Sequence, residues 1–307
     1  MIAPPRATDV DTAPGGARTG PLQGGSRLAD QTFRYLCLAA GLLVLLVLGL
    51  ILISTGNEAM PAFREVGFGF LTNDVWNPPA GQFGALPFIY GTLVASIIAL
   101  LIAVPISLGL ALFITELAPK KLRTPVVYLV DLLAAVPSVV YGLWAILVFT
   151  PRAFGRSFMS AGIILAIMIT PIVTSISREV FATVPRDQKE AAYGLGATRF
   201  EMIRGAVFPY SRTGLVGAVM LGLGRAMGET IAVALVIGSS PAITAHLFEP
   251  GDAMAAVIAN QFGEAVGTHR AALIGLGVVL FILTVIVNVL ARKVTGRADR
   301  RLAGAKA

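Results

Sequence analysis

The fold of this chain is decided by residues 187–209, which read DQKEAAYGLGATRFEMIRGAVFP and lie between two long apolar runs. Charged side chains recur through the segment, whereas the runs before and after it, 157–177 and 213–238, are each longer than 18 residues. Apolar runs of that length predict helices that cross a bilayer. A polar segment between two such helices belongs in water, so we interpret residues 187–209 as a surface on which another protein docks.

The composition of the whole chain predicts an integral membrane protein. Hydrophobic residues make up 56% of the 307 residues and charged residues 13%, about half of the roughly 25% typical of soluble domains. Mean hydropathy is +0.80. Backbone groups in lipid must be hydrogen-bonded within their own segment, so we predict an all-α integral membrane fold with six transmembrane helices. The six apolar runs cover residues 35–55, 88–115, 126–150, 157–177, 213–238 and 271–291.

The basic residues predict which side of the membrane each loop occupies. Nineteen Lys and Arg residues fall on one side of the six predicted spans and four on the other. The richer side holds both termini and residues 187–209, which the positive-inside rule places in the cytoplasm. The net charge of +7 therefore reflects membrane topology. Because no basic face is interleaved with aromatic residues, nucleic-acid binding is not expected.

Residues 187–209 divide into two expected helices. The first, 187–195, presents Glu190 beside small residues that permit close approach of a partner. Gly194 and Gly196 can adopt a positive φ and reverse the chain. A second helix, 198–207, then returns to the membrane, and we expect Pro209 to end it. This pattern is typical of a helix that binds in a groove of another protein; an ordinary amphipathic loop between spans is the alternative.

The fifth predicted span carries two charges at membrane depth. Arg225 lies near the middle of residues 213–238 and Glu229 follows four residues later, so both are expected on one side of a single helix. A charge at the bilayer centre costs about 2.5–3.5 kcal/mol, so such residues pair or face a water-filled path. The donor fork of arginine fits a tetrahedral oxyanion, and Glu229 could hold that fork when no anion is bound. We interpret the pair as an anion relay; a self-neutralising structural pair is the alternative.

Four glycines give the same span a small cross-section. They are Gly217, Gly222, Gly224 and Gly228, of which the last two form a G-x-x-x-G pair. Small residues at this spacing let helices approach closely in a membrane. We therefore expect this helix to lie in the interior of a helix bundle.

The sequence disfavours catalytic and metal sites. It contains no G-x-x-x-x-G-K-[ST] loop, so any ATP hydrolysis must occur on a partner. His246 and His269 have no neighbouring ligands at metal spacing, and Cys37 is a single cysteine in the first span. No histidine lies in a span and no G-x-S-x-G or H-E-x-x-H motif occurs, which disfavours a membrane hydrolase. We expect no cofactor or metal on this chain.

Two sets of residues resemble known transporter families. The first resembles the EAA signature of ABC importer permeases and consists of Glu190, Ala191, Ala192, Gly196 and Pro209. The second is similar to PstC-type phosphate permeases. It consists of residues 83–93 (FGALPFIYGTL), 115–119 (TELAP), 224–233 (GRAMGETIAV), 247–252 (LFEPGD) and 258–265 (IANQFGEA).

The resemblance implies a type I ABC importer permease fold whose cytoplasmic coupling helices insert into an ATPase subunit. It also implies a function, the ATP-driven import of inorganic phosphate, and a multi-pass location in the bacterial plasma (inner) membrane. Arg225, Glu229 and Thr230 are the candidate substrate-pathway residues. The implied partners are a PstA-like permease, a PstB-like ATPase dimer that binds ATP and Mg²⁺, an extracytoplasmic PstS-like phosphate-binding protein and membrane lipid.

These inferences give four predicted regions and leave alternative functions open. Residues 1–30 are expected to be a disordered cytoplasmic tail, 31–87 the first transmembrane helix with an outer loop, 88–292 the permease core, and 293–307 a basic cytoplasmic tail. A permease for another oxyanion, such as molybdate or sulfate, would share nearly all these features. A secondary transporter would need coupling residues of its own, and the segment 187–209 would then have no partner.

Overall fold

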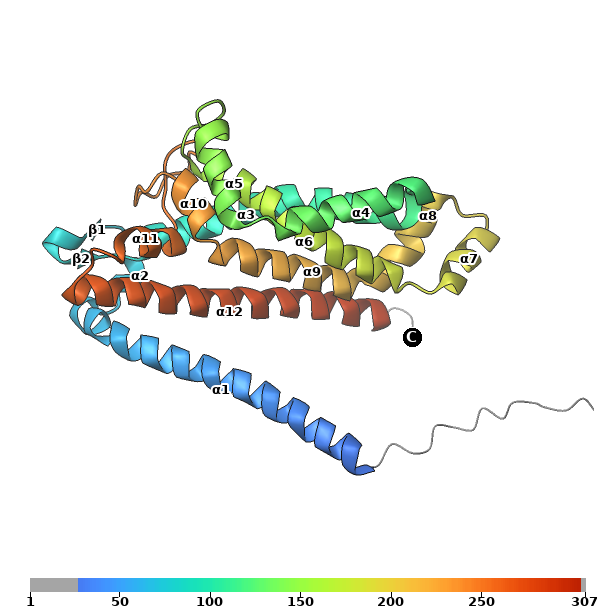
Figure 1. The fold of residues 1–307 in the computed structure, drawn as a ribbon, viewed down its shortest axis with the longest axis horizontal. Coiled ribbons are helices and arrows are strands. Elements are labelled where there is room, and N and C mark those ends of the chain that lie inside the picture. Colours follow the sequence, from blue (N-terminus) through green and yellow to red (C-terminus); the bar gives the residue numbers. More distant parts are fainter. Residues whose placement is uncertain (1–26, 305–307) are drawn as a thin grey trace, which may run out of the picture. The chain divides into compact units, whose positions relative to one another are not determined.

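The computed structural model describes the backbone of residues 27–304 and the side chains of residues 30–293 (Figure 1). The predicted tail of residues 1–30 lies mostly outside this part of the chain, as do the last residues of the tail predicted for 293–307. The chain divides into two compact units, Met1–Ile51 and Leu52–Ala307. In the first unit, helix α1 (Arg27–Val66) begins, and its apolar side chains between residues 35 and 51 are largely exposed. Such a surface suits a helix whose surroundings are lipid.

Four long helices form the centre of the second unit. They are α3 (Leu86–Leu112), α6 (Phe158–Ala182), α9 (Phe208–Gly228) and α12 (Gly267–Gly304). Helix α6 packs against both α3 and α9, and α12 packs against α9. The α3–α6 contact is close because Gly162 faces Ile98, with which an added Cβ would clash. Pro105 and Pro171 lie inside α3 and α6, and both helices continue through them.

The third predicted span is bent, and the expectation of one continuous helix was wrong. Helix α4 (Lys120–Ala135) meets α5 (Ser138–Trp144) and the π-helical turn η3 (Ala145–Phe149) at an angle of 88°. The bend falls at Val136 and Pro137, where the chain is extended. Proline donates no backbone hydrogen bond and disfavours the helical conformation of the preceding residue, which explains the break.

The structure gives five to six candidate spans, against the six predicted. Within the described part of the chain, five helices are long and apolar enough to cross a membrane, and the total is six if the bent pair forms one span. The fold is therefore that of a polytopic helical membrane protein, as the apolar runs predicted. The residues between the spans gather at the two ends of the central helices (Figure 1).

One end of the second unit carries a small cap of mixed structure. Its elements are α2 (Gly69–Thr72), β1 (Trp76–Asn77), η1 (Pro78–Ala80), β2 (Gln82–Phe83), α10 (Ile231–Val236) and α11 (Met254–Gln261). Strands β1 and β2 pair antiparallel, with Trp76 opposite Phe83. The Trp76 indole N–H donates to Gln261 Oε1 at 3.0 Å, and its ring lies edge-on to Phe88 at 5.1 Å. These contacts fix the hairpin to α3 and α11.

The opposite end carries the polar segment of residues 187–209. The elements at this end are η2 (Phe113–Leu117), α7 (Arg186–Gly194), α8 (Arg199–Met202) and the π-helical turn η4 (Ile203–Val207). Figure 1 shows α7 and α8 at the end of the bundle away from the β1–β2 hairpin. Helix α9 begins at this end and runs toward the cap, whereas α12 runs in the reverse direction.

Candidate functional site

Residues 187–209, called the coupling segment below, fold as a short helix followed by a sharp reversal. Helix α7 covers Arg186–Gly194, within one residue of the prediction. Gly196 has a φ of 82°, and its N–H donates to Tyr193 O at 2.9 Å. The Ala197 N–H donates to Ala192 O at 3.1 Å. This is the Schellman arrangement, in which a glycine of positive φ satisfies the last carbonyls of a helix.

The second helix of the coupling segment starts where predicted but does not end there. Thr198 and Glu201 form a reciprocal capping box: the Thr198 N–H donates to Glu201 Oε2 at 2.8 Å, and the Glu201 N–H donates to Thr198 Oγ1 at 3.4 Å. The prediction that Pro209 stops this helix was wrong. Helix α8 continues through η4 into α9, and Pro209 lies in the first turn of α9. The wide π turn before Pro209 accommodates a residue that has no N–H to donate.

The coupling segment presents apolar side chains to solvent. Leu195 is 90% exposed and Phe200 70% exposed, and Glu190 and Ala191 of the EAA triplet are exposed beside them. Exposed apolar residues rimmed by charges are typical of a protein interaction surface. The arrangement therefore suits a partner that covers Leu195 and Phe200 and contacts Glu190 at the edge.

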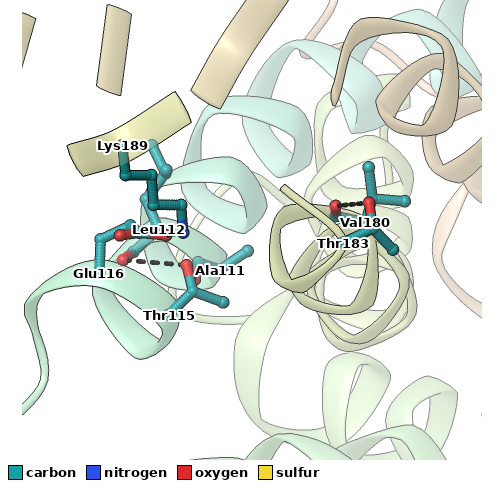
Figure 2. Close-up of polar contacts among 7 residues, drawn as sticks. All are labelled: Ala111, Leu112, Thr115, Glu116, Val180, Thr183 and Lys189. Carbon is teal, nitrogen blue, oxygen red and sulfur yellow. Dashed lines mark hydrogen bonds and ion pairs between the residues drawn. The ribbon is translucent and has the colours of Figure 1, made fainter. Parts of the chain in front are cut away.

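An ion pair ties the coupling segment to the end of α3. The Lys189 ammonium of α7 donates to Glu116 Oε1 of η2 at 2.6 Å, and the two side chains are only 21% and 10% exposed. Figure 2 shows Lys189 reaching across to Glu116, while the hydroxyl of the adjacent Thr115 donates to Ala111 O at 2.9 Å within the same turn. The pair therefore joins α7 to the end of α3 through a contact that is largely shielded from water.

Sequence reasoning did not find this ion pair. Glu116 stands in the TELAP block and Lys189 in the coupling segment, 73 residues apart. Both were visible as charged residues on the basic side of the membrane. Their pairing follows from the packing of α7 against the end of α3, and no local pattern in the sequence encodes it.

The substrate-pathway residues predicted on one helix lie on two sides of a helix break. Helix α9 ends at Gly228; Glu229 is extended, with φ −69° and ψ 126°, and α10 begins at Ile231. The prediction that Arg225 and Glu229 share one face of a continuous span is therefore wrong. Glycine at position 228 weakens the helix, and the Thr230 hydroxyl donates to the exposed Gly228 carbonyl at 3.2 Å. Helix α10 instead packs on α5.

The two charged residues also do not pair. Arg225 is in the last turn of α9 with an exposed side chain, and Glu229 and Thr230 are half-buried. Within the part of the chain that the structure describes, neither Arg225 nor Glu229 takes part in an ion pair. The self-neutralising alternative is thus not realised in this chain, and Arg225 remains available to a ligand or to another subunit.

The glycines of α9 divide between a packed and an open face. An added Cβ at Gly222 would approach Val173 Cγ2 to 2.7 Å, so this glycine permits close contact with α6. At Gly217, Gly224 and Gly228 no described atom lies within 4 Å of an added Cβ. The expected close packing is therefore found at Gly222, and the G-x-x-x-G pair does not contribute to it within this chain.

One buried carboxyl was not among the residues predicted from the sequence. Asp252 follows the loop after α10, is 3% exposed, and accepts a hydrogen bond at Oδ1 from the Ala253 N–H at 2.8 Å. Burial raises the pKa of this carboxyl from its usual 3.8 to about 7, and the hydrogen bond partly offsets that rise. Gly91 of α3 lies directly against the Asp252 backbone carbonyl, where any side chain would clash. Both residues fall in blocks that resemble PstC-type permeases.

A family match identifies the class of protein to which this fold belongs. Residues 103–302 match the family described as "Binding-protein-dependent transport system inner membrane component". The chain therefore belongs to this family.

Within the family, the chain is similar to proteins named PstC. It is 42% identical to the phosphate transport system permease protein PstC of Mesorhizobium japonicum, covering 89% of this chain and 92% of that protein. The PstC protein of Haemophilus influenzae is also 42% identical, with 86% and 92% covered. PstC 2 of Mycobacterium tuberculosis is 39% identical, with 88% and 93% covered.

Solved structures of ABC transporters share the fold. A bacterial alginate ABC transporter, determined with a pentasaccharide-bound periplasmic protein, aligns with a TM-score of 0.62 at 19% identity, covering 89% of this chain and 98% of that one. The inward-facing MetNI methionine ABC transporter aligns with a TM-score of 0.54 at 18% identity, covering 74% and 99%. The fold is thus that of a type I ABC importer permease.

Proposed function

We propose that this chain is the membrane-spanning permease subunit of an ATP-driven inorganic phosphate importer. The observation that carries the proposal is the coupling segment, an exposed docking surface joined to the spans through Lys189 and Glu116. The names of the similar PstC proteins support phosphate as the substrate, as does Arg225, whose guanidinium fits a tetrahedral oxyanion.

The similarity to PstC proteins supports the proposed assembly. In this proposal the chain pairs with a PstA-like permease, and a PstB-like ATPase dimer hydrolyses the ATP, which is consistent with a sequence that has no phosphate-binding loop. A PstS-like binding protein delivers phosphate from outside. We propose that both termini and the coupling segment lie in the cytoplasm, where ATP is available, and the excess of Lys and Arg on that side supports this orientation.

The proposed mechanism is alternating access. Closure of the ATPase dimer moves α7, and the Lys189–Glu116 contact passes this movement to α3. Phosphate released by the binding protein contacts Arg225 near Glu229 and Thr230 and leaves toward the cytoplasm when the transporter resets. Because phosphate carries between one and two negative charges near neutral pH, one arginine compensates only part of its charge, and further cationic groups are required.

Uptake measurements test the substrate. Cells that lack this chain are supplied with micromolar radiolabelled phosphate, and sulfate and molybdate uptake are measured in parallel. We expect selective loss of phosphate uptake, restored when the chain is expressed again. Normal phosphate uptake with loss of sulfate or molybdate uptake would keep the permease architecture and overturn the substrate.

A further inference from the structure

A cavity of 1040 Å³ lies between α6, α9 and α12. Its α9 wall extends from Thr213 to Arg225, which spans about 18 Å at 1.5 Å per residue. Its α12 wall includes Asn288 and Arg292, the second of which directly follows the last apolar run. Helix α9 runs toward the cap and α12 runs away from it (Figure 1); Arg225 is in the last turn of α9, and Arg292 is in the second half of α12. The cavity therefore carries guanidinium groups at two levels.

The lining of the cavity suits an anion. Among the described residues that form it, none is Asp or Glu, and its polar side chains are Thr213, Arg225, Asn288 and Arg292. A guanidinium offers five N–H donors and an amide two, so Arg292 and Asn288 can both donate to phosphate oxygens. An anion that leaves Arg225 for the cytoplasm through this cavity would otherwise cross an apolar wall, which is costly for a charged group.

Two glycines keep the cavity open. Gly217 and Gly224 both line it, and no described atom lies within 4 Å of a Cβ added at either position. Neither glycine has a positive φ, so neither is required by the backbone, and glycine inside a helix costs roughly 0.5–1 kcal/mol relative to alanine. Room in the cavity is a physical reason for glycine at these two positions, in contrast to Gly222, which packs on α6.

We infer that Asn288 and Arg292 form a second oxyanion-binding position, which receives phosphate from Arg225 on its way to the cytoplasm. This inference rests on the proposed function and extends it to α12, a helix for which the sequence predicted only a lipid-spanning segment. Its ligand chemistry is the phosphate group, which a transported phosphate and a lipid headgroup share. We assign it to the transported phosphate because the same cavity contains Arg225.

The test compares Arg292→Gln with Lys293→Gln in the assembled importer. Lys293 is exposed, does not line the cavity, and contributes the same cytoplasmic positive charge. We expect Arg292→Gln to lower the maximal rate of phosphate uptake about tenfold, the size expected for one lost hydrogen bond between charged groups, with the external KM unchanged. Lys293→Gln should transport at the wild-type rate. Equal losses in both variants, or no loss in Arg292→Gln, would overturn the inference.

Two further measurements separate the remaining explanations. In proteoliposomes made without anionic phospholipid, the Arg292→Gln defect should persist; if it disappears there, the ligand is a lipid headgroup and the inference is wrong. Gly217→Leu, which fills the cavity, should block uptake while the partner permease still co-purifies. Loss of co-purification would instead assign this face to a helix interface and overturn the inference. If wild-type importer itself fails to move phosphate, the proposed function fails, independently of Arg292.

Discussion

The coupling segment and the α9–α10 break are both short interruptions of helical structure, and they are built in different ways. In the coupling segment, local hydrogen bonds define each turn: Gly196 closes α7, and Thr198 with Glu201 opens α8. At the α9–α10 break, Thr230 caps the Gly228 carbonyl, and the direction of α10 is decided by its packing on α5. Turns made by neighbouring residues are encoded locally, whereas a break inside an apolar span depends on distant partners.

The two regions also differ in whether their basic side chains are paired within the chain. Lys189 is paired and largely shielded from water in the coupling segment, whereas Arg225 at the break has an exposed side chain and no ion pair within the described chain. A paired charge contributes to structure, so its loss can be repaired by an equivalent pair. A charge without a partner in its own chain is suited to bind something else, and no second change in this chain should replace it.

The largest expected effect is at Arg225. Arg225→Gln removes the guanidinium and should reduce phosphate uptake to background, because the amide cannot compensate a phosphate charge. Arg225→Lys keeps the charge without the planar donor fork and should restore only part of the rate. Radiolabelled phosphate uptake measures the rate, and co-purification of the partner subunits should be unchanged. Wild-type uptake by Arg225→Gln would show that this charge is structural after all.

An intermediate effect is expected at the Lys189–Glu116 pair. Reversing either charge alone leaves like charges in a largely shielded contact. That should cost about 1–3 kcal/mol, less than the roughly 3–5 kcal/mol of a fully buried pair, and should lower uptake several-fold. The double variant Lys189→Glu with Glu116→Lys re-forms the pair and should recover most of the rate. Lys120→Glu reverses an exposed charge near the same end of α3 and serves as the control. Failure of the double variant to recover would mean that Lys189 acts on the ATPase.

The smallest effect on transport is expected at Asp252, where the change appears in stability. Because the pKa of Asp252 is raised to about 7 in the fold, the fold favours its protonated form. Its stabilising contribution is therefore full below about pH 4 and is lost as the pH rises to 7. Three pKa units correspond to about 4 kcal/mol at most. The unfolding midpoint of Asp252→Asn should exceed that of wild type at pH 8 and match it near pH 4.

A neighbouring carboxyl provides the control for that measurement. Glu249 lies in the same loop and is exposed, so Glu249→Gln should leave the pH dependence of the midpoint as it is in wild type. If Asp252→Asn follows the wild-type midpoint at every pH, the carboxyl is ionised in the fold, and donors other than the Ala253 N–H compensate its burial.

The sequence was sufficient for the spans and for the local turns. Long apolar runs predicted the spans, because backbone groups in lipid must be hydrogen-bonded within their own segment. Gly194 and Gly196 predicted a reversal after α7, and the structure has the positive φ at Gly196 and not at Gly194. The sequence was not sufficient at Pro137, because the apolar run 126–150 predicted one continuous helix. It was also not sufficient at Gly228, because the helical periodicity of residues 213–238 does not continue across the break between α9 and α10. The Lys189–Glu116 contact and the cavity between α9 and α12 depend on tertiary packing, for which one sequence carries no local signal.

Because η2 and η4 are π-helical turns, the effect of deleting a residue depends on where in the helix the deletion falls. A π turn holds one residue more than the α-helical turn it replaces. Deleting a single residue from Ile203–Val207 would convert η4 to regular helix and leave α8 and α9 close to their present angular relation, because the π turn already absorbs the extra residue. Deleting one residue from the regular turns of α9 before Arg225 would instead rotate the coupling segment by about 100° relative to Arg225. Leu195 and Phe200 would then face a different side of the bundle, so a one-residue deletion should disrupt coupling more in α9 than in η4.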